Sequence, residues 1–223
     1  PTATADGPGP NDPQPSPSDP GQTQGSGSGE LAPGQERSGD GPALVSLNLP
    51  PNANHMITVS FEGDGLFQAQ LIDSDGDIVQ MLASEYGDFT RTPYTATRLV
   101  ELAIFGIGEA AAVEISEAEG EWSLMLQDIQ EAPLWPDVTS GTGASVLRVD
   151  PDAVDDQLTL EGTYDGESNF IVWSHTPEEF GSTLLFNEIG DYSGESQRPM
   201  EPGTFVMEIQ ARWDGEWTLE PAD

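Results

Sequence analysis

One five-residue phrase occurs twice in the chain, and this repetition limits the fold more than any other feature of the sequence. The phrase reads Gly-Glu-Trp-Ser-Leu at residues 120–124 and Gly-Glu-Trp-Thr-Leu at residues 215–219. A Ser-Gly-x-Gly motif precedes each phrase, at residues 38–41 and 140–143, and leads into an apolar segment. Matches that recur in the same order predict an internal duplication.

A third match lies between the other two and sets the expected domain boundaries. Gly-Asp-Phe at residues 87–89 corresponds to Gly-Asp-Tyr at residues 190–192. Three ordered matches at similar spacing are hard to explain by chance. We therefore expect a first domain over residues 42–130, a joint over residues 131–139 and a second domain over residues 140–223.

Apolar and polar residues alternate along several short segments that are bounded by Gly, Asp, Asn or Pro. The alternation is clear in residues 57–61, 67–71, 113–115 and 122–126. A period of two is typical of half-buried strands, and helical periodicity is hard to find in this chain. The sequence therefore predicts an all-β fold, with a small β-sandwich in each domain.

The first 41 residues differ in composition from the rest of the chain. Residues 1–41 are dominated by Pro, Gly, Ser, Asp, Thr and Gln and have little apolar surface to bury, which predicts a disordered linker. It is either a stalk that lifts the folded part from a membrane or cell wall, or a spacer with no further role. The joint at residues 131–139 holds two prolines, and we expect Trp135 to pack there between the domains.

The charge balance is strongly acidic. Forty Asp and Glu stand against six Arg, with no Lys, and the formal net charge is −34. No basic run exists to neutralise phosphates, so we expect no nucleic-acid partner and no attraction to anionic membranes. The acidity fits a halophilic or salt-tolerant source, the replacement of Lys by Arg fits a GC-rich genome equally well, and both explanations stay open.

The sequence also bears on localisation. The chain begins at Pro1 and contains no apolar run of about eighteen residues, so we expect no signal peptide or membrane span within it, and a folded part that does not insert in a membrane. We interpret it as a mature or trimmed ectodomain, extracellular or at the cell surface, whose targeting or anchoring segment, if any, was removed upstream.

Three segments of the second stretch carry a resemblance. SNFIVWS (168–174), LLFNEIGDYSGES (184–196) and MEIQARWDGEWTLE (207–220) resemble repeats of actinobacterial secreted or membrane-anchored proteins. More remotely, both stretches are similar to the jelly-roll-like bacterial pre-peptidase C-terminal domains. The resemblance covers most of residues 141–221 and implies an extracellular accessory β-sandwich without a catalytic site of its own. It carries no functional residues over, and in the first stretch the position of Trp173 is occupied by Gln or Leu.

The tryptophans divide into two groups. Trp122 and Trp217 begin the last expected strand of each domain, where a large aromatic side chain can anchor a small core. Trp173 and Trp213 are less constrained by the pattern. If either side chain faces solvent, it becomes a candidate for stacking on a sugar ring, which makes both of them candidate ligand-binding residues.

The segment Asp73-Ser-Asp-Gly-Asp superficially resembles a calcium-binding loop. It departs from the EF-hand pattern, because its Gly stands fourth rather than sixth. A hairpin turn explains it better, since Asp-Gly lies between two apolar strands. The alternative is a Ca²⁺ site formed by Asp73, Asp75 and Asp77 with help from Glu62 and Asp64. Apart from Ca²⁺ at this segment, we expect no cofactor.

Motifs for catalysis are missing from the sequence, so we expect the protein not to be an enzyme. It has no cysteine, no Gly-x-Ser-x-Gly and no phosphate-binding loop. His175 with Glu178 and Glu179 could hold a metal weakly, but a surface loop explains them better. We expect a structural or interaction module that binds a protein or glycan at the cell surface. The alternatives are a carbohydrate-binding accessory module and a secreted hydrolase.

Overall fold

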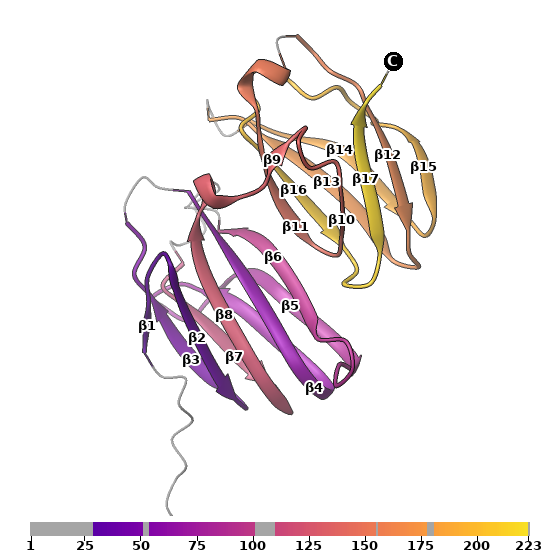
Figure 1. Cartoon of the computed structure of the whole chain (residues 1–223). Coiled ribbons are helices and arrows are strands. Elements are labelled where there is room, and N and C mark those ends of the chain that lie inside the picture. The colour runs from indigo at the N-terminus through magenta and orange to yellow at the C-terminus, as the bar shows by residue number, and fades with distance from the viewer. Residues whose placement is uncertain (1–28, 51–53, 101–109, 155, 178–180, 223) are drawn as a thin grey trace, which may run out of the picture.

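The computed structural model describes residues 29–50, 54–100, 110–154, 156–177 and 181–222. These residues form strands β1 to β17 and two short 3-10 helices, so the all-β prediction is confirmed (Figure 1). No helix in the described part of the chain is long and apolar enough to cross a membrane.

The N-terminal part, residues 30–128, is built around one long strand. Its strands pair in the order β1-β3-β7-β4-β8-β2, and β5 and β6 also pair with β4. The first half of β4 pairs with β6 and β8 and the second half with β5 and β7, so β4 belongs to both layers of a sandwich. The strand bounds are β1 (Glu30–Leu31), β2 (Gln35–Asp40), β3 (Ala43–Leu47), β4 (His55–Ile72), β5 (Ile78–Asp88), β6 (Tyr94–Val100), β7 (Ala112–Glu117) and β8 (Gly120–Asp128).

The C-terminal part, residues 134–221, has two separate sheets. One has the order β10-β17-β12-β15 and the other the order β14-β13-β16-β11-β9. The strand bounds are β9 (Leu134–Trp135), β10 (Ser140–Thr142), β11 (Ser145–Val149), β12 (Leu160–Asp165), β13 (Asn169–His175), β14 (Ser182–Ile189), β15 (Tyr192–Glu195), β16 (Val206–Ala211) and β17 (Glu216–Pro221). The helices are η1 (Ile129–Glu131) and η2 (Pro151–Ala153).

The two parts share one pattern of strand pairing. The parallel pair β1·β3 corresponds to the parallel pair β9·β11, and β2·β8 corresponds to β10·β17. The series β3-β7-β4-β5 corresponds to β11-β16-β13-β14, and the single strand β4 takes the place of β12 and β13. The division into two tandem domains stays a prediction, and this shared pairing is the observation that favours it.

The repeated motifs of the sequence are neighbours in space. Gly39 on β2 pairs with Trp122 on β8, and Gly141 on β10 pairs with Trp217 on β17. Each indole N–H donates to a backbone carbonyl of the preceding motif, at 2.8 Å from Trp122 to Gly41 and at 2.9 Å from Trp217 to Gly143. Both tryptophans are 2% exposed, so the expected core positions are confirmed.

A glycine is required opposite each indole. A Cβ atom added to Gly39 would lie 2.5 Å from Cζ2 of Trp122, and one added to Gly141 would lie 2.5 Å from Cζ2 of Trp217. Carbon atoms in van der Waals contact are about 3.5 Å apart or more, so a larger residue would displace the ring. The Ser-Gly-x-Gly motif therefore provides both the space for the tryptophan and the acceptor for its N–H.

A second repeated pattern, a stacked aromatic pair in each part, was not predicted from the sequence. Phe61 stacks on Phe67 with ring centroids 4.5 Å apart, and Tyr164 stacks on Phe170 at 5.1 Å. The stacked residues are six positions apart in each part, and a glycine lies two positions after the first ring in both. The signal was present in the sequence as an aromatic residue, an acid, a glycine, three residues and a phenylalanine.

Two sequence expectations about the ends of the domains are wrong. Strands β1 and β2 lie inside the predicted linker of residues 1–41, because backbone pairing with β3 and β8 orders a segment that has few apolar side chains. Residues 1–28 lie outside the described part. Trp135 belongs to β9 and is buried in the core of the C-terminal part, where its indole N–H donates to Leu219 O at 3.0 Å.

Candidate functional site

Strand β6 approaches β11 where the two parts meet (Figure 1). A groove of about 450 Å³ lies at this place. Hydroxyl side chains provide much of its lining, together with one indole and one carboxylate. The lining residues are Thr92, Pro93, Thr95, Thr97, Thr142, Ala144, Ser145, Trp213 and Asp214. They come from three segments far apart in the sequence, which β6, the β10–β11 turn and the β16–β17 turn bring together.

Trp213 is placed in the groove by its contact with the N-terminal part. Its ring packs nearly perpendicular to that of Phe89, at 77° and with centroids 5.4 Å apart, and it remains half-buried. Gly143 makes the approach possible, because it adopts φ of +71° and a Cβ atom there would lie 3.1 Å from Trp213 O. The remaining indole surface lines the groove.

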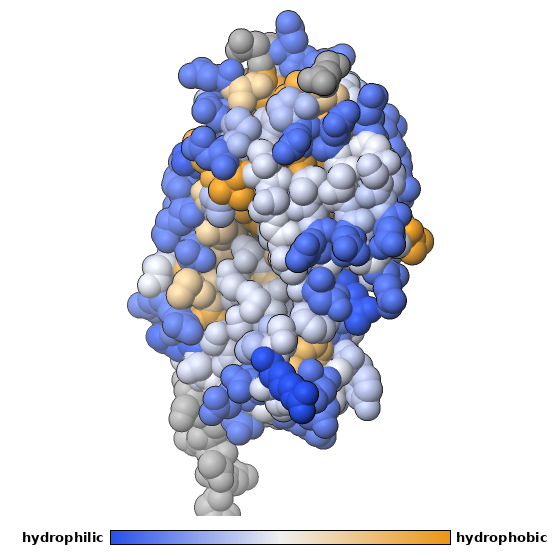
Figure 2. Space-filling view, turned by 45° about the vertical axis from the view of Figure 1, so that its right-hand side comes forward, coloured by the Kyte–Doolittle hydropathy of each residue, from blue (hydrophilic) through white to orange (hydrophobic). Residues whose placement is uncertain are grey.

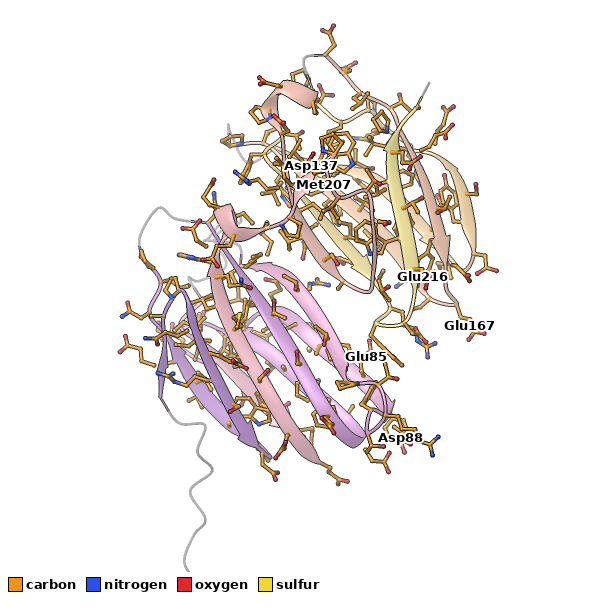
Figure 3. The ribbon with its side chains drawn as sticks, in the orientation of Figure 1. Glu85, Asp88, Asp137, Glu167, Met207 and Glu216 are labelled. Atoms are coloured by element: carbon orange, nitrogen blue, oxygen red, sulfur yellow. The ribbon has the colours of Figure 1, made fainter. Side chains whose placement is uncertain are left out.

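Charged groups lie near Trp213, at and beside the β16–β17 turn. Arg212 Nε lies 3.0 Å from Asp214 Oδ1, which holds the β16–β17 turn together. Glu85 lies where β5 approaches this turn (Figure 3). Burial raises the pKa of the Glu85 carboxyl, the Arg212 guanidinium opposes that shift, and Asp214 adds to it. Burial also raises the pKa of the Tyr94 phenol, and Glu85 reinforces the effect.

The chemistry of the lining suits a polyhydroxylated ligand. Threonine and serine hydroxyls both donate and accept hydrogen bonds, and the Asp214 carboxylate accepts them. An indole face packs well against an apolar ring face. The hydroxyl run Thr-Pro-Tyr-Thr-Ala-Thr at residues 92–97 was not singled out from the sequence, although its alternation places Thr95 and Thr97 on one face of β6.

The second tryptophan proposed from the sequence lies elsewhere. Trp173 is half-buried on β13, opposite Glu208 on β16 and Leu184 on β14. It is not among the residues that line the groove. The structure therefore does not bring Trp173 and Trp213 into one site.

The Asp73 segment is a hairpin turn between β4 and β5. Asp73 Oδ1 accepts hydrogen bonds from the backbone N–H groups of Asp75 and Asp77, both at 2.9 Å, and Gly76 adopts φ of +88°. No group of three or more His, Cys, Asp or Glu residues in the described part of the chain is placed to hold a metal ion. The structure thus does not gather Asp73, Asp75 and Asp77, or Glu62 and Asp64, into a Ca²⁺ site.

Calcium provides a test of this turn. Asp73→Ala removes the acceptor for two backbone N–H groups and should lower the free energy of unfolding by about 1 kcal/mol. Millimolar CaCl₂ should shift the Tm no more than MgCl₂ does at equal ionic strength, in the wild type and in the variant alike. A calcium-specific rise in Tm that Asp73→Ala abolishes would establish the site and contradict the turn interpretation.

The expectation that His175 decorates a surface loop is wrong. His175 is the last residue of β13 and is 6% exposed, with its Nδ1 3.0 Å from Ser182 Oγ. Glu178 and Glu179 lie outside the described residues. Burial lowers the pKa of His175, and the nearby Glu208 carboxylate raises it in part.

This burial predicts a pH dependence of stability. The folded-state pKa lies below the ordinary value of 6.5, so the unfolded chain binds the proton more readily. The contribution is therefore fully present above pH 6.5 and is lost as the pH falls through 6.5 toward the folded pKa. Urea unfolding at about pH 7.5 and pH 5.5 should show a smaller loss for His175→Gln than for the wild type. Ser182→Ala, which keeps the imidazole, is the matched control, and equal losses in all three proteins would contradict the assignment.

Comparisons of the chain with family models and with curated proteins find no match. The proposals that follow therefore rest on the residues and their geometry.

Proposed function

We propose that the chain is a non-catalytic tandem of two β-sandwiches that serves outside the cell as a structural and interaction module. The observation that carries the proposal is the interface at which β6 of the N-terminal part meets β11 and β16 of the C-terminal part. This interface, the seam, couples the two parts through apolar, backbone and ionic contacts. A fixed seam makes the pair a spacer of constant geometry that presents its faces in a defined orientation.

The apolar contribution to the seam is a cluster of buried side chains drawn from both parts. Val146 and Val206 from the C-terminal part pack against side chains that precede them in the chain, and Phe205 lies at the edge. The other members are Met56, Leu99, Ile129 and Ala132. The N-terminal core also extends across the seam, because Ala144 belongs to it and Trp213 packs against it.

Polar contacts fix the register of the seam. The backbone N–H of Thr97 on β6 donates to Ala144 O at 3.0 Å. Arg98 Nε lies 3.1 Å from Glu208 Oε1, and the Glu208 side chain is only 5% exposed. The N–H direction does not meet hydrogen-bond geometry, so this contact is an ion pair. A sliding or hinged interface would not hold a buried charge in place, since an unpaired buried charge is strongly unfavourable.

The surface supports a role in a polar environment. Hydrophilic side chains dominate the face seen in Figure 2, and hydrophobic ones form small separate areas. With a net charge of −34, molecules of this protein repel one another, which keeps a displayed module dispersed. The part of the predicted linker that lies outside the described residues, residues 1–28, would connect the tandem to the cell surface.

Antibody access tests the proposed location. An antibody raised against the folded part should label intact cells of the source organism that produce the full chain. Labelling that appears only after the cells are permeabilised would overturn the extracellular assignment. Antibody against a known cytoplasmic protein provides the control for cell integrity.

The groove favours a second candidate function, carbohydrate binding. Its lining combines an indole, a carboxylate and several hydroxyls, which are the groups that recognise sugar rings and their hydroxyls. The site lies between the two sandwiches, a place where ligand sites commonly occur. The seam would then have two roles, because it would also position the walls of the groove.

A glycan array with the full chain tests this candidate. If a glycan binds in the groove, Trp213→Ala should weaken binding at least about ten-fold, because aromatic anchors provide a large share of binding energy. Trp213→Phe retains the packing on Phe89 and controls for loss of structure. Trp173→Ala should leave binding unchanged. Binding that depends on Trp173 instead would move the site to the outer face of the five-stranded sheet.

A further inference from the structure

We propose that the outer face of β3, β7, β4 and β5 is a docking surface for a basic protein partner that presents an arginine between aliphatic side chains. The inference rests on the tandem arrangement proposed above, because it compares equivalent faces of the two parts. The N-terminal part covers one of these faces, and on the other face the equivalent aliphatic side chains are exposed.

The covered face belongs to the C-terminal part. Four residues opposite one another on adjacent strands form a row across β11, β16, β13 and β14. The row reads Val146, Glu208, Trp173 and Leu184. The N-terminal part covers its first two members with an arginine and aliphatic side chains, because Arg98 pairs with Glu208 and Val146 packs in the cluster of Met56 and Leu99.

The equivalent row of the N-terminal part has the same chemistry. Across β3, β7, β4 and β5 it reads Leu44, Glu114, Gln70 and Met81. An aliphatic residue again precedes a glutamate, and another aliphatic residue ends the row. Gln70 Nε2 donates to Glu114 Oε2 at 2.6 Å, which holds the carboxylate in position on this face. Leu44 is 55% exposed and Met81 is 37% exposed, so the two ends of the row lie at the surface, while Glu114 is half-buried and Gln70 is 9% exposed.

Further apolar side chains extend the row along the same face. Ile78 is 56% exposed and lies opposite Ile72 on β4, whose own side chain is half-buried. Tyr86 is 82% exposed and lies opposite Leu66, which is also exposed. Five of the eight large hydrophobic residues exposed in the described part of the chain lie on this one sheet, namely Leu44, Leu66, Ile78, Met81 and Tyr86. Clusters of this kind on an otherwise polar protein mark interaction sites.

A second copy of the chain is a poor occupant. The end of the C-terminal part that corresponds to the covering end of the N-terminal part carries Glu161 and Glu195 paired across β12 and β15. They stand where Thr58 and Thr97 pair across β4 and β6. Ser196 follows Glu195 as Arg98 follows Thr97, so the arginine is missing. In a second copy, two glutamates would therefore meet Glu114 where the N-terminal part presents an arginine to Glu208. Charge complementarity therefore favours a different, basic partner.

The probe for the experiment is a grafted full chain that presents the expected partner chemistry. The graft gives the C-terminal end the side chains with which the N-terminal part covers its neighbour. Its substitutions are Glu161→Thr, Glu195→Thr, Ser196→Arg and Gln197→Leu. Sedimentation velocity should show the wild type as a monomer and the grafted chain in association with the wild type. Thermal melting confirms beforehand that each chain is folded.

Substitutions in the accepting wild-type chain decide which face is used. Leu44→Asp and Glu114→Arg should each weaken association with the grafted chain at least about ten-fold. Ile189→Asp, at an exposed apolar position on the C-terminal part, is the matched control and should have no effect. Folded chains that do not associate, or association that ignores Leu44 and Glu114, would overturn the proposal.

Two further outcomes would identify a different occupant and also overturn the proposal. One is self-association of the wild type that Leu44→Asp abolishes. The other is a disulfide in the monomer between cysteines introduced at Leu44 and at Phe105, a residue of the segment 101–109 outside the described part of the chain. Such a disulfide would show that this segment of the same chain covers the face. The native chain has no cysteine, so such a disulfide is unambiguous. Neither result depends on whether the protein is found outside the cell.

Discussion

Trp217→Ala should lower the free energy of unfolding by about 3–5 kcal/mol, and Trp122→Ala should do the same. Each indole is almost fully buried and fills the space that a glycine on the neighbouring strand leaves open. Alanine removes this packing and the hydrogen bond to Gly143 O or Gly41 O. The measurement is urea unfolding at fixed salt concentration.

Trp173→Ala provides the matched control for these two variants. Trp173 is half-buried on an outer sheet face, so its loss leaves a smaller cavity and should cost less. Similar costs for Trp122 and Trp217 would mean that they have the same role in their two cores. A large cost for one and none for the other would contradict the proposed duplication.

Arg98→Met should destabilise the chain by about 3 kcal/mol, because it leaves the Glu208 carboxylate buried without its partner. The double variant Arg98→Met with Glu208→Met should recover most of this loss, since two apolar side chains can replace a buried ion pair at little cost. Urea unfolding of the four proteins of this double-mutant cycle gives the coupling energy between the two residues.

The same cycle reports on the seam, since Arg98 belongs to β6 and Glu208 to β16. Strong coupling means that the two parts hold each other in place, as a spacer of fixed geometry requires. Arg98→Met with unchanged stability would contradict this, and so would a double variant as unstable as the single one. Arg148→Met at the exposed Gln130 contact serves as a control for the general loss of a positive charge.

The fold class could be predicted because each strand of the core is marked by alternating side chains. Strands β1 and β2 could not be predicted in this way. β2 has no buried side chain, and backbone hydrogen bonds to β8 order it. Backbone pairing leaves no trace in side-chain hydropathy, so the polar composition of residues 30–40 was attributed to a linker.

The tryptophan phrase and its glycine motif were recognised as repeats, but not as partners. The sequence contains both ends of the contact, Gly39 with Trp122 and Gly141 with Trp217, more than seventy residues apart. Only the three-dimensional fold shows that each glycine leaves the space that its tryptophan fills. The stacked pairs Phe61–Phe67 and Tyr164–Phe170 could have been found from their shared spacing.

The candidate groove could be predicted only in part. Trp213 was singled out because its role in the core was uncertain, and it does line the groove. The hydroxyl residues opposite it lie on β6 and on the β10–β11 turn, and their meeting depends on how the two parts pack. The sequence predicts a surface loop at His175, whereas β13 extends to this residue and ends there.

The central claim is that the same small β-sandwich occurs twice. In each copy a tryptophan packs against a glycine of the motif that precedes it. Nuclear Overhauser contacts between the indole protons and the glycine α protons measure this directly. The account predicts contacts of Trp122 with Gly39 and of Trp217 with Gly141, and both indole N–H protons protected from exchange. Absence of either contact, or an indole in contact with the glycine of the other unit, would contradict it.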